Sequence, residues 1–157
     1  MQFNEVPEGD QMDIHGGIKT LIVEDSIPTR RMLRARMETL GCVIVGEAEN
    51  PTQGLKLFRE LDPQVVTLDL IMPQVDEFNT EQLFKIIREE KPDTSVIVIS
   101  SSSKAMTAAT YISHGAVAYL EKPFVNFDQL REKLDALYPD LTAQRHSRSS
   151  ASSSLLR

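Results

Sequence analysis

The sequence predicts an α/β fold in which a parallel β-sheet is covered by helices on both faces. Short β-branched segments alternate along the chain with longer segments of helical periodicity. The short segments are apolar at consecutive positions, which is typical of strands buried on both faces. A chain of 157 residues is long enough for one such domain with tails. Right-handed crossovers between parallel strands bring their carboxyl ends to one edge of the sheet, where ligands of such folds bind.

Five short runs rich in Val and Ile are the predicted strands. They are Thr20–Val23, Val43–Val45, Val65–Leu68, Val96–Ile99 and Val117–Leu120. Between and after them lie the predicted helices. The first helix begins with Ser26 as its N-cap and Pro28 in its first turn, and ends at Gly41. Its apolar face consists of Leu33, Met37 and Leu40. Similar periodicity predicts helices over Thr52–Leu61, Glu81–Glu89, Lys104–His114 and Asp128–Tyr138.

The chain divides into a flexible leader, one domain and a tail. Residues 1–17 lack sustained periodicity and are expected to be a flexible leader, whereas residues 18–138 form the domain. Residues 139–157 are rich in Ser and include too few apolar side chains for a core of their own, which predicts a disordered tail. We expect no effector domain after Pro139, because that segment is too short for one.

Composition and charge exclude several kinds of partner. The chain holds 23 acidic against 17 basic residues, for a formal net charge of −6, which argues against bulk nucleic-acid or membrane binding. Cys42 is the only cysteine, which excludes an internal disulfide framework. No apolar stretch approaches the roughly 20 residues that cross a bilayer. We therefore expect a cytoplasmic protein.

Polar residues follow the strands where the sheet is expected to gather ligands. Glu24 and Asp25 follow the first strand, and Asp69 follows the third. Three carboxylates at one place are costly unless a cation neutralises them, and oxygen ligands suit Mg2+ or Mn2+ better than zinc. The alternative is that the pair Glu24-Asp25 merely starts a loop and caps the next helix.

Ser100 and Lys122 follow the last two strands. Ser100 is either a strand-end hydroxyl satisfied by the backbone or a functional group. Lys122 is either a structural ion-pair partner of the acids or a cation that holds a phosphoryl group. A nucleophilic carboxylate flanked by a metal, a lysine and a hydroxyl has the parts that phosphoryl transfer to a protein requires.

In their order along the chain, these residues resemble the receiver domain of two-component response regulators, most closely the single-domain chemotaxis (CheY-like) type. The resemblance covers residues 18–138. It rests on Glu24-Asp25, Asp69-Leu70-Ile71-Met72-Pro73, Ser100-Ser101, Tyr119 and Lys122-Pro123-Phe124. It implies a doubly wound five-stranded sheet of order 2-1-3-4-5.

The resemblance also implies a role for each matching residue. Asp69 is then the phosphoacceptor, and Mg2+ is held by Glu24, Asp25, Asp69 and the backbone carbonyl of Ile71. Lys122 contacts the phosphoryl oxygens and Ser100 swings toward them. Tyr119 then turns inward and reshapes the face made by the fourth helix, the last strand and the last helix. Without the resemblance, Tyr119 is better interpreted as a partly buried core aromatic.

Two departures from the family pattern follow Asp69. Where the family has Met-Pro-x-x-Asp-Gly, this chain has Glu77 in place of the glycine that normally supplies a positive backbone angle, and it gains about three residues by spacing before the next helix. We expect a remodelled loop over residues 76–80, with Asn79 capping the next helix and Glu77 adding negative charge near the site. Ile71 is expected to shield an acyl phosphate from water.

The leading interpretation is a phosphorylation-controlled switch whose output is binding. Its partners are a sensor histidine kinase and a downstream protein, for which the resemblance suggests the flagellar motor switch. It is not expected to be an enzyme with a separate substrate, beyond its own phosphotransfer and dephosphorylation. Two alternatives stay open: a pseudo-receiver that binds a partner without phosphorylation, and a metal-dependent hydrolase. The hydrolase is ranked last, because such enzymes place a second aspartate where this chain has Ile71.

Overall fold

Five strands and five helices alternate over the part of the chain that the computed structural model describes, residues 16–72, 76–101, 105–122 and 127–142. In chain order they are β1 (Ile18–Val23), α2 (Ile27–Thr39), β2 (Cys42–Ala48), α3 (Pro51–Leu61), β3 (Val65–Asp69), α4 (Thr80–Glu90), β4 (Ser95–Ser100), α5 (Ala105–Ser113), β5 (Ala118–Glu121) and α6 (Phe127–Leu137). Every predicted strand and helix is therefore present. None of the described helices is both long and apolar enough to span a bilayer.

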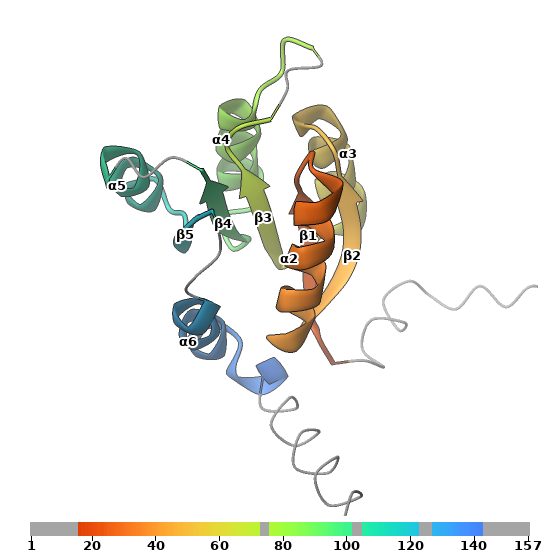
Figure 1. Ribbon diagram of the computed structural model, residues 1–157, viewed down its shortest axis with the longest axis vertical. Coiled ribbons are helices and arrows are strands. Elements are labelled where there is room, and N and C mark those ends of the chain that lie inside the picture. Colours follow the sequence, from red (N-terminus) through yellow and green to blue (C-terminus); the bar gives the residue numbers. More distant parts are fainter. Residues whose placement is uncertain (1–15, 73–75, 102–104, 123–126, 143–157) are drawn as a thin grey trace, which may run out of the picture.

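The five strands form one parallel sheet in the order β2-β1-β3-β4-β5 (Figure 1). This is the order that the resemblance implied, so the predicted fold is confirmed. The strand order reverses between β1 and β3. β2 lies on one side of β1, whereas β3 and the strands that follow it lie on the other side. Sites in doubly wound sheets lie beyond the carboxyl ends of the strands at this reversal. Here those ends are Val23 and Asp69.

Helices cover both faces of the sheet, as the continuously apolar strands predict (Figure 1). One face packs against α2 and α6 through a cluster that includes Ile22, Leu33 and Leu130. The other face packs against α3, α4 and the partly buried Tyr111 of α5 through a cluster that includes Leu68, Phe58 and Phe84. Burial on both faces makes the sheet a rigid platform for the side chains at its carboxyl edge.

Local signals fix where α2 begins and ends. The Ser26 side chain accepts a hydrogen bond from the Thr29 N–H at 3.4 Å, and Pro28 lies in the first turn. The helix ends before Gly41, whose φ of 93° only glycine adopts easily. Leu33, Met37 and Leu40 are all buried. The prediction for this helix is confirmed at both ends and along its apolar face.

The structure describes four residues beyond Tyr138, the last residue of the predicted domain. The Tyr138 hydroxyl donates to the Gln64 carbonyl at 3.0 Å and lies 2.8 Å from the Ser95 Oγ. Residues 139–142 then form a helical turn in which Leu141 packs against the core and Thr142 is buried. Residues 1–15 and 143–157, most of the predicted leader and tail, lie outside the described residues.

Candidate functional site

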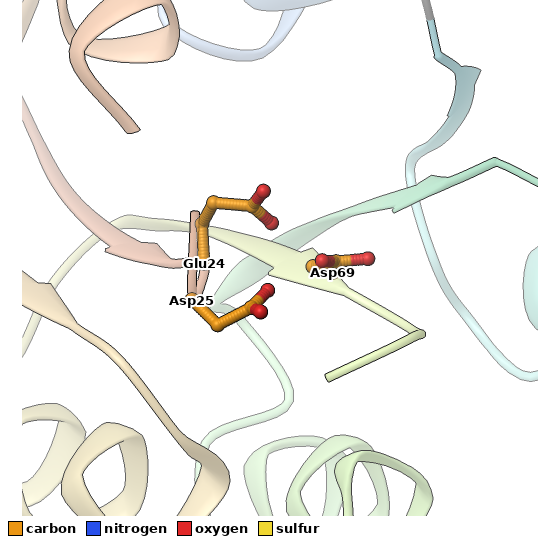
Figure 2. Close-up of side chains that lie close together, drawn as sticks. All are labelled: Glu24, Asp25 and Asp69. Atoms are coloured by element: carbon orange, nitrogen blue, oxygen red, sulfur yellow. The ribbon is translucent and has the colours of Figure 1, made fainter. Parts of the chain in front are cut away.

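Glu24, Asp25 and Asp69 gather at the carboxyl edge of the sheet. Asp69 is the last residue of β3, and Glu24 and Asp25 directly follow β1, the strand that pairs with β3. One carboxylate oxygen from each residue lies within 4.8 Å of the others. Figure 2 shows the Glu24 and Asp25 side chains, which directly follow β1, close to that of Asp69 at the end of β3. The predicted convergence of the three acids is confirmed.

Lys122 connects the two buried acids. Its Nζ donates to Glu24 Oε1 at 2.9 Å and to Asp69 Oδ2 at 3.2 Å. Both carboxylates are almost fully buried, whereas the side chain of Lys122 is partly exposed. The Lys122 backbone N–H donates to the Ser100 carbonyl at 2.9 Å, which fixes the lysine beside the end of β4. The structural ion pair that the sequence allowed is therefore present.

The site has too little positive charge for its three acids. The pKa of Glu24 is raised to about 7, mostly by burial and also by the neighbouring Asp69, and Lys122 only partly offsets these two effects. Burial by itself lowers the pKa of Lys122, but its contacts with Glu24 and Asp69 outweigh burial and raise it. The lysine thus stays charged, and the remaining excess of negative charge favours either a proton on Glu24 or a cation.

The donor atoms fit a small divalent cation. Glu24 Oε2 is buried and lacks a hydrogen-bond partner among the described residues, although buried carboxylate oxygens are normally satisfied. The possible metal ligands in this cluster are all carboxylate oxygens, which Mg2+ and Mn2+ prefer. The Glu24 backbone is held on both sides, because its N–H donates to the Ala48 carbonyl and its carbonyl accepts from Arg30. An unsatisfied oxygen on a fixed backbone is suited to be a metal ligand.

Asp69 is oriented by the chain that follows it. The Ile71 N–H donates to Asp69 Oδ1 at 3.0 Å, and the Leu70 N–H donates to the Ile99 carbonyl at 2.9 Å. Both oxygens of Asp69 therefore have partners, one in the loop and one in Lys122. Ile71 is 59% exposed. Two roles of Ile71 stay predictions: the backbone carbonyl ligand that the resemblance implies, and the shield against water expected of its apolar side chain.

Ser100 and Tyr119 occupy the strands next to Asp69. Ser100 is the buried last residue of β4, whose neighbour Ile99 is in register with Asp69. Tyr119 lies on β5 in register with Val98, and it is half-buried against the core cluster of α3 and α4. Both positions agree with the resemblance. That of Tyr119 agrees equally with the simpler interpretation of a partly buried core aromatic. The switching roles of both residues stay predictions.

The loop after Asp69 departs from the family pattern at its described end. Asn79 caps α4 and forms a reciprocal capping box with Gln82, as the sequence predicted for Asn79. Among the described non-glycine residues, only Asp62 has a positive φ, so Glu77 does not reproduce the glycine turn. Glu77 is exposed, and its predicted effect on the site stays a prediction. Residues 73–75, like Pro123 and Phe124 of the lysine motif, lie outside the described residues.

Sequence reasoning missed one contact of this loop. Asp76 accepts a hydrogen bond from the Thr52 hydroxyl of α3 at 2.5 Å and another from the Phe78 N–H at 2.8 Å. The bond from the Phe78 N–H could have been predicted, because Asp side chains in turns often accept a hydrogen bond from the backbone N–H two residues later. No local signal identifies Thr52 as the partner.

Together, the strand order and the carboxylate cluster at the reversal define a doubly wound α/β protein with an acidic cluster at the position where ligands of such folds bind. A family model for the response regulator receiver domain matches residues 20–135, most of the described chain. This protein therefore belongs to the response regulator receiver domain family, whose members are generally not enzymes and bind Mg2+ through acidic residues.

Individual relatives differ in how much of their length this chain covers. Chemotaxis protein CheY of Listeria monocytogenes is 32% identical over 118 residues, which cover 75% of this chain and 96% of that protein. The probable C4-dicarboxylate response regulator DctR of Halalkalibacterium halodurans is 32% identical over 118 residues. This chain spans half of the length of that relative. The solved response regulator domain of Thermotoga maritima CheB superposes with a TM-score of 0.62 at 28% identity, covering 80% of this chain and 96% of that one.

Proposed function

We propose that this protein is a response regulator that accepts a phosphoryl group on Asp69 from a sensor histidine kinase. An oxygen of Asp69 forms the new bond to phosphorus while the bond from phosphorus to the kinase imidazole breaks. The imidazole keeps the electron pair of that bond and takes a proton from solvent. Burial and the fixed contacts with Ile71 and Lys122 support Asp69 as the acceptor, because they hold its carboxylate in one orientation.

Glu24, Asp25 and Asp69, with the backbone carbonyl of Ile71, would hold Mg2+ or Mn2+. When bound, the metal neutralises charge on the phosphoryl oxygens as they approach the acidic cluster. Lys122 already contacts Asp69 and Glu24, so its ammonium is placed to exchange a carboxylate contact for a phosphoryl oxygen. The cluster alone repels an anion, and these cations make the approach of a phosphate favourable.

We propose that Ser100 and Tyr119 couple phosphorylation of Asp69 to a change in the protein surface. A phosphoryl group on Asp69 offers new acceptor oxygens to the Ser100 hydroxyl at the neighbouring strand end. Movement of Ser100 leaves room for the half-buried Tyr119 to turn inward and reshape the face of α5, β5 and α6. A downstream protein then binds one form better than the other. The similarity to proteins named CheY suggests that this downstream protein belongs to the flagellar motor switch.

One observation carries this proposal: the carboxylates of Glu24 and Asp25 and the ammonium of Lys122 lie close to the Asp69 carboxylate at the carboxyl edge of the sheet. Incubation with Mg2+ and acetyl phosphate, followed by intact mass measurement, tests it. The wild-type chain is expected to gain one phosphoryl group and Asp69→Asn none. No gain in either chain would favour a pseudo-receiver that works without phosphorylation.

A further inference from the structure

Glu24 and Asp25 lie in the short connection between the end of β1 and the start of α2. β1 ends at Val23, where its pairing with β2 and β3 also ends, and α2 begins at Ile27. The Glu24 N–H still donates to the Ala48 carbonyl at 2.9 Å. The next peptide, which joins Glu24 to Asp25, lies beyond the paired part of the sheet. The placement of both proposed metal ligands therefore depends on how this peptide is held.

Arg30 holds this peptide from within α2. Its Nη1 donates to the Glu24 carbonyl at 2.9 Å, and its backbone N–H donates to the Ser26 carbonyl at 2.9 Å. Arg30 thus contacts the connection on both sides of Asp25. Its side chain is only 12% exposed, although arginine side chains are mostly exposed in proteins. The guanidinium is therefore largely withdrawn from water and bound to a backbone oxygen of the site.

The planar shape of the guanidinium strengthens this hold. While Nη1 donates to the Glu24 carbonyl, Nη2 lies 3.6 Å from Glu49 Oε1, just after the end of β2. An arginine presents its donors in a fixed plane, and hydrogen bonds from a charged donor are stronger than those from a neutral one. Glu49 is exposed, so this ion pair contributes little to stability but orients the guanidinium. Arg30 therefore acts on the site through its bond to the Glu24 carbonyl.

We propose that Arg30 is a positioning residue, whose guanidinium fixes the peptide between Glu24 and Asp25 so that both carboxylates stay in the arrangement that binds Mg2+. Each of these acids supplies one of the oxygens that lie within 4.8 Å of one another in the cluster. The charge of Arg30 has the opposite effect, because a positive charge beside the cluster by itself opposes the binding of a cation. Positioning and charge therefore predict opposite results when Arg30 is neutralised. This inference rests on the metal site of the proposed function but not on phosphorylation.

The test compares Arg30→Met with Arg31→Met. Each removes one positive charge at neighbouring positions of α2, but Arg31 is exposed and the bond to the Glu24 carbonyl comes from Arg30. Calorimetric titration of the full chain with MgCl2 gives the affinity, at a temperature at which circular dichroism shows each variant to be folded. Arg30→Met is expected to weaken Mg2+ binding about fivefold, the factor for one hydrogen bond of ordinary net strength. Arg31→Met should bind Mg2+ at least as tightly as the wild type. Arg30→Lys, which keeps the charge and one donor group, should lie between Arg30→Met and the wild type.

Equal or tighter Mg2+ binding in Arg30→Met would overturn the proposal, even with a lower melting temperature, because Arg30 would then only attach α2 to the sheet. An equal loss in Arg31→Met would also overturn it. If Arg30→Met does not fold, Arg30→Lys is compared with Arg31→Lys, and only weaker binding by Arg30→Lys supports positioning. A wild-type chain that binds no Mg2+ would overturn both the metal site and this inference. Mg2+ binding without phosphoryl uptake would overturn the proposed phosphotransfer, while the affinity comparison still decides the role of Arg30.

Discussion

Lys122 Nζ lies 2.9 Å from Glu24 Oε1, a contact that joins residues 98 positions apart in the sequence and ties the last strand to the first. The same ammonium lies 3.2 Å from Asp69 Oδ2, so one cation serves two buried acids. The stability of the site therefore depends on the balance between these two carboxylates and one ammonium.

Replacing Lys122 with Met should destabilise the protein. The apolar side chain leaves Glu24 and Asp69 buried without a cation, and we expect a loss of about 1–3 kcal/mol in the free energy of unfolding, less than for a fully buried pair because Lys122 is partly exposed. Urea unfolding of the metal-free chain measures the change. Lys122→Arg keeps the positive charge and should lose less, so equal losses in both variants would show that charge is not the cause.

Stability without metal should depend on the protonation of Glu24. Its pKa is raised from 4.5 to about 7 in the folded protein, so the folded state binds more protons than the unfolded state between these values. Stability is therefore greatest below this window and is lost as pH rises through it. Melting temperatures of wild type and Glu24→Gln measured at both ends of the window check the sign. A wild-type curve parallel to that of Glu24→Gln would contradict the prediction.

Mg2+ should stabilise the wild-type chain. A ligand that binds only the folded state, at a concentration ten times its dissociation constant, adds about 1.4 kcal/mol to the free energy of unfolding. This raises the melting temperature of a domain of this size by about 3–5 °C. Asp25→Asn removes one proposed ligand at the half-buried edge of the cluster and should reduce this increase. The same increase in both chains would exclude Asp25 from the site.

Ile71→Asn should shorten the lifetime of the phosphorylated protein. Ile71 is exposed beside Asp69, and an amide in its place admits and orients water where the apolar side chain excludes it. Release of inorganic phosphate after donor removal gives the rate, which we expect to rise several-fold. Because the side chain is exposed, the melting temperature should stay constant. Equal rates in the two chains would remove the shielding role.

Asn79→Ala should weaken the start of α4. The substitution removes one half of the capping box with Gln82, and such a loss costs about 1 kcal/mol. Urea unfolding reports the change, and Gln82→Ala provides the matched variant for the other half. If both variants are as stable as the wild type, the capping box contributes nothing in solution.

The acidic cluster could be predicted from the sequence because it depends only on where each strand ends. Each acid follows a short apolar run, and parallel strands must end at one edge of the sheet, so Glu24, Asp25 and Asp69 could be placed together. The start of α2 at Ser26 and the cap at Asn79 were predictable for a similar reason, since capping depends on the adjacent backbone.

Contacts between distant segments were not predictable. A hydroxyl such as that of Thr52 in a first helical turn is common, and nothing near it specifies Asp76 as its partner. The helical turn of residues 139–142 was not predicted either, although a proline such as Pro139 fits the first turn of a helix. The sequence likewise could not specify which acids Lys122 contacts, because that depends on side-chain packing across β1, β3 and β5.

The central claim is that Asp69 itself carries the phosphoryl group. Borohydride reduces an aspartyl phosphate to homoserine, so treatment of the chain after reaction with acetyl phosphate and Mg2+, followed by peptide mass spectrometry, identifies the modified residue. Homoserine is expected at position 69 in the wild type, and only when Mg2+ is present. Homoserine at another aspartate, or none after efficient phosphoryl uptake, would contradict it.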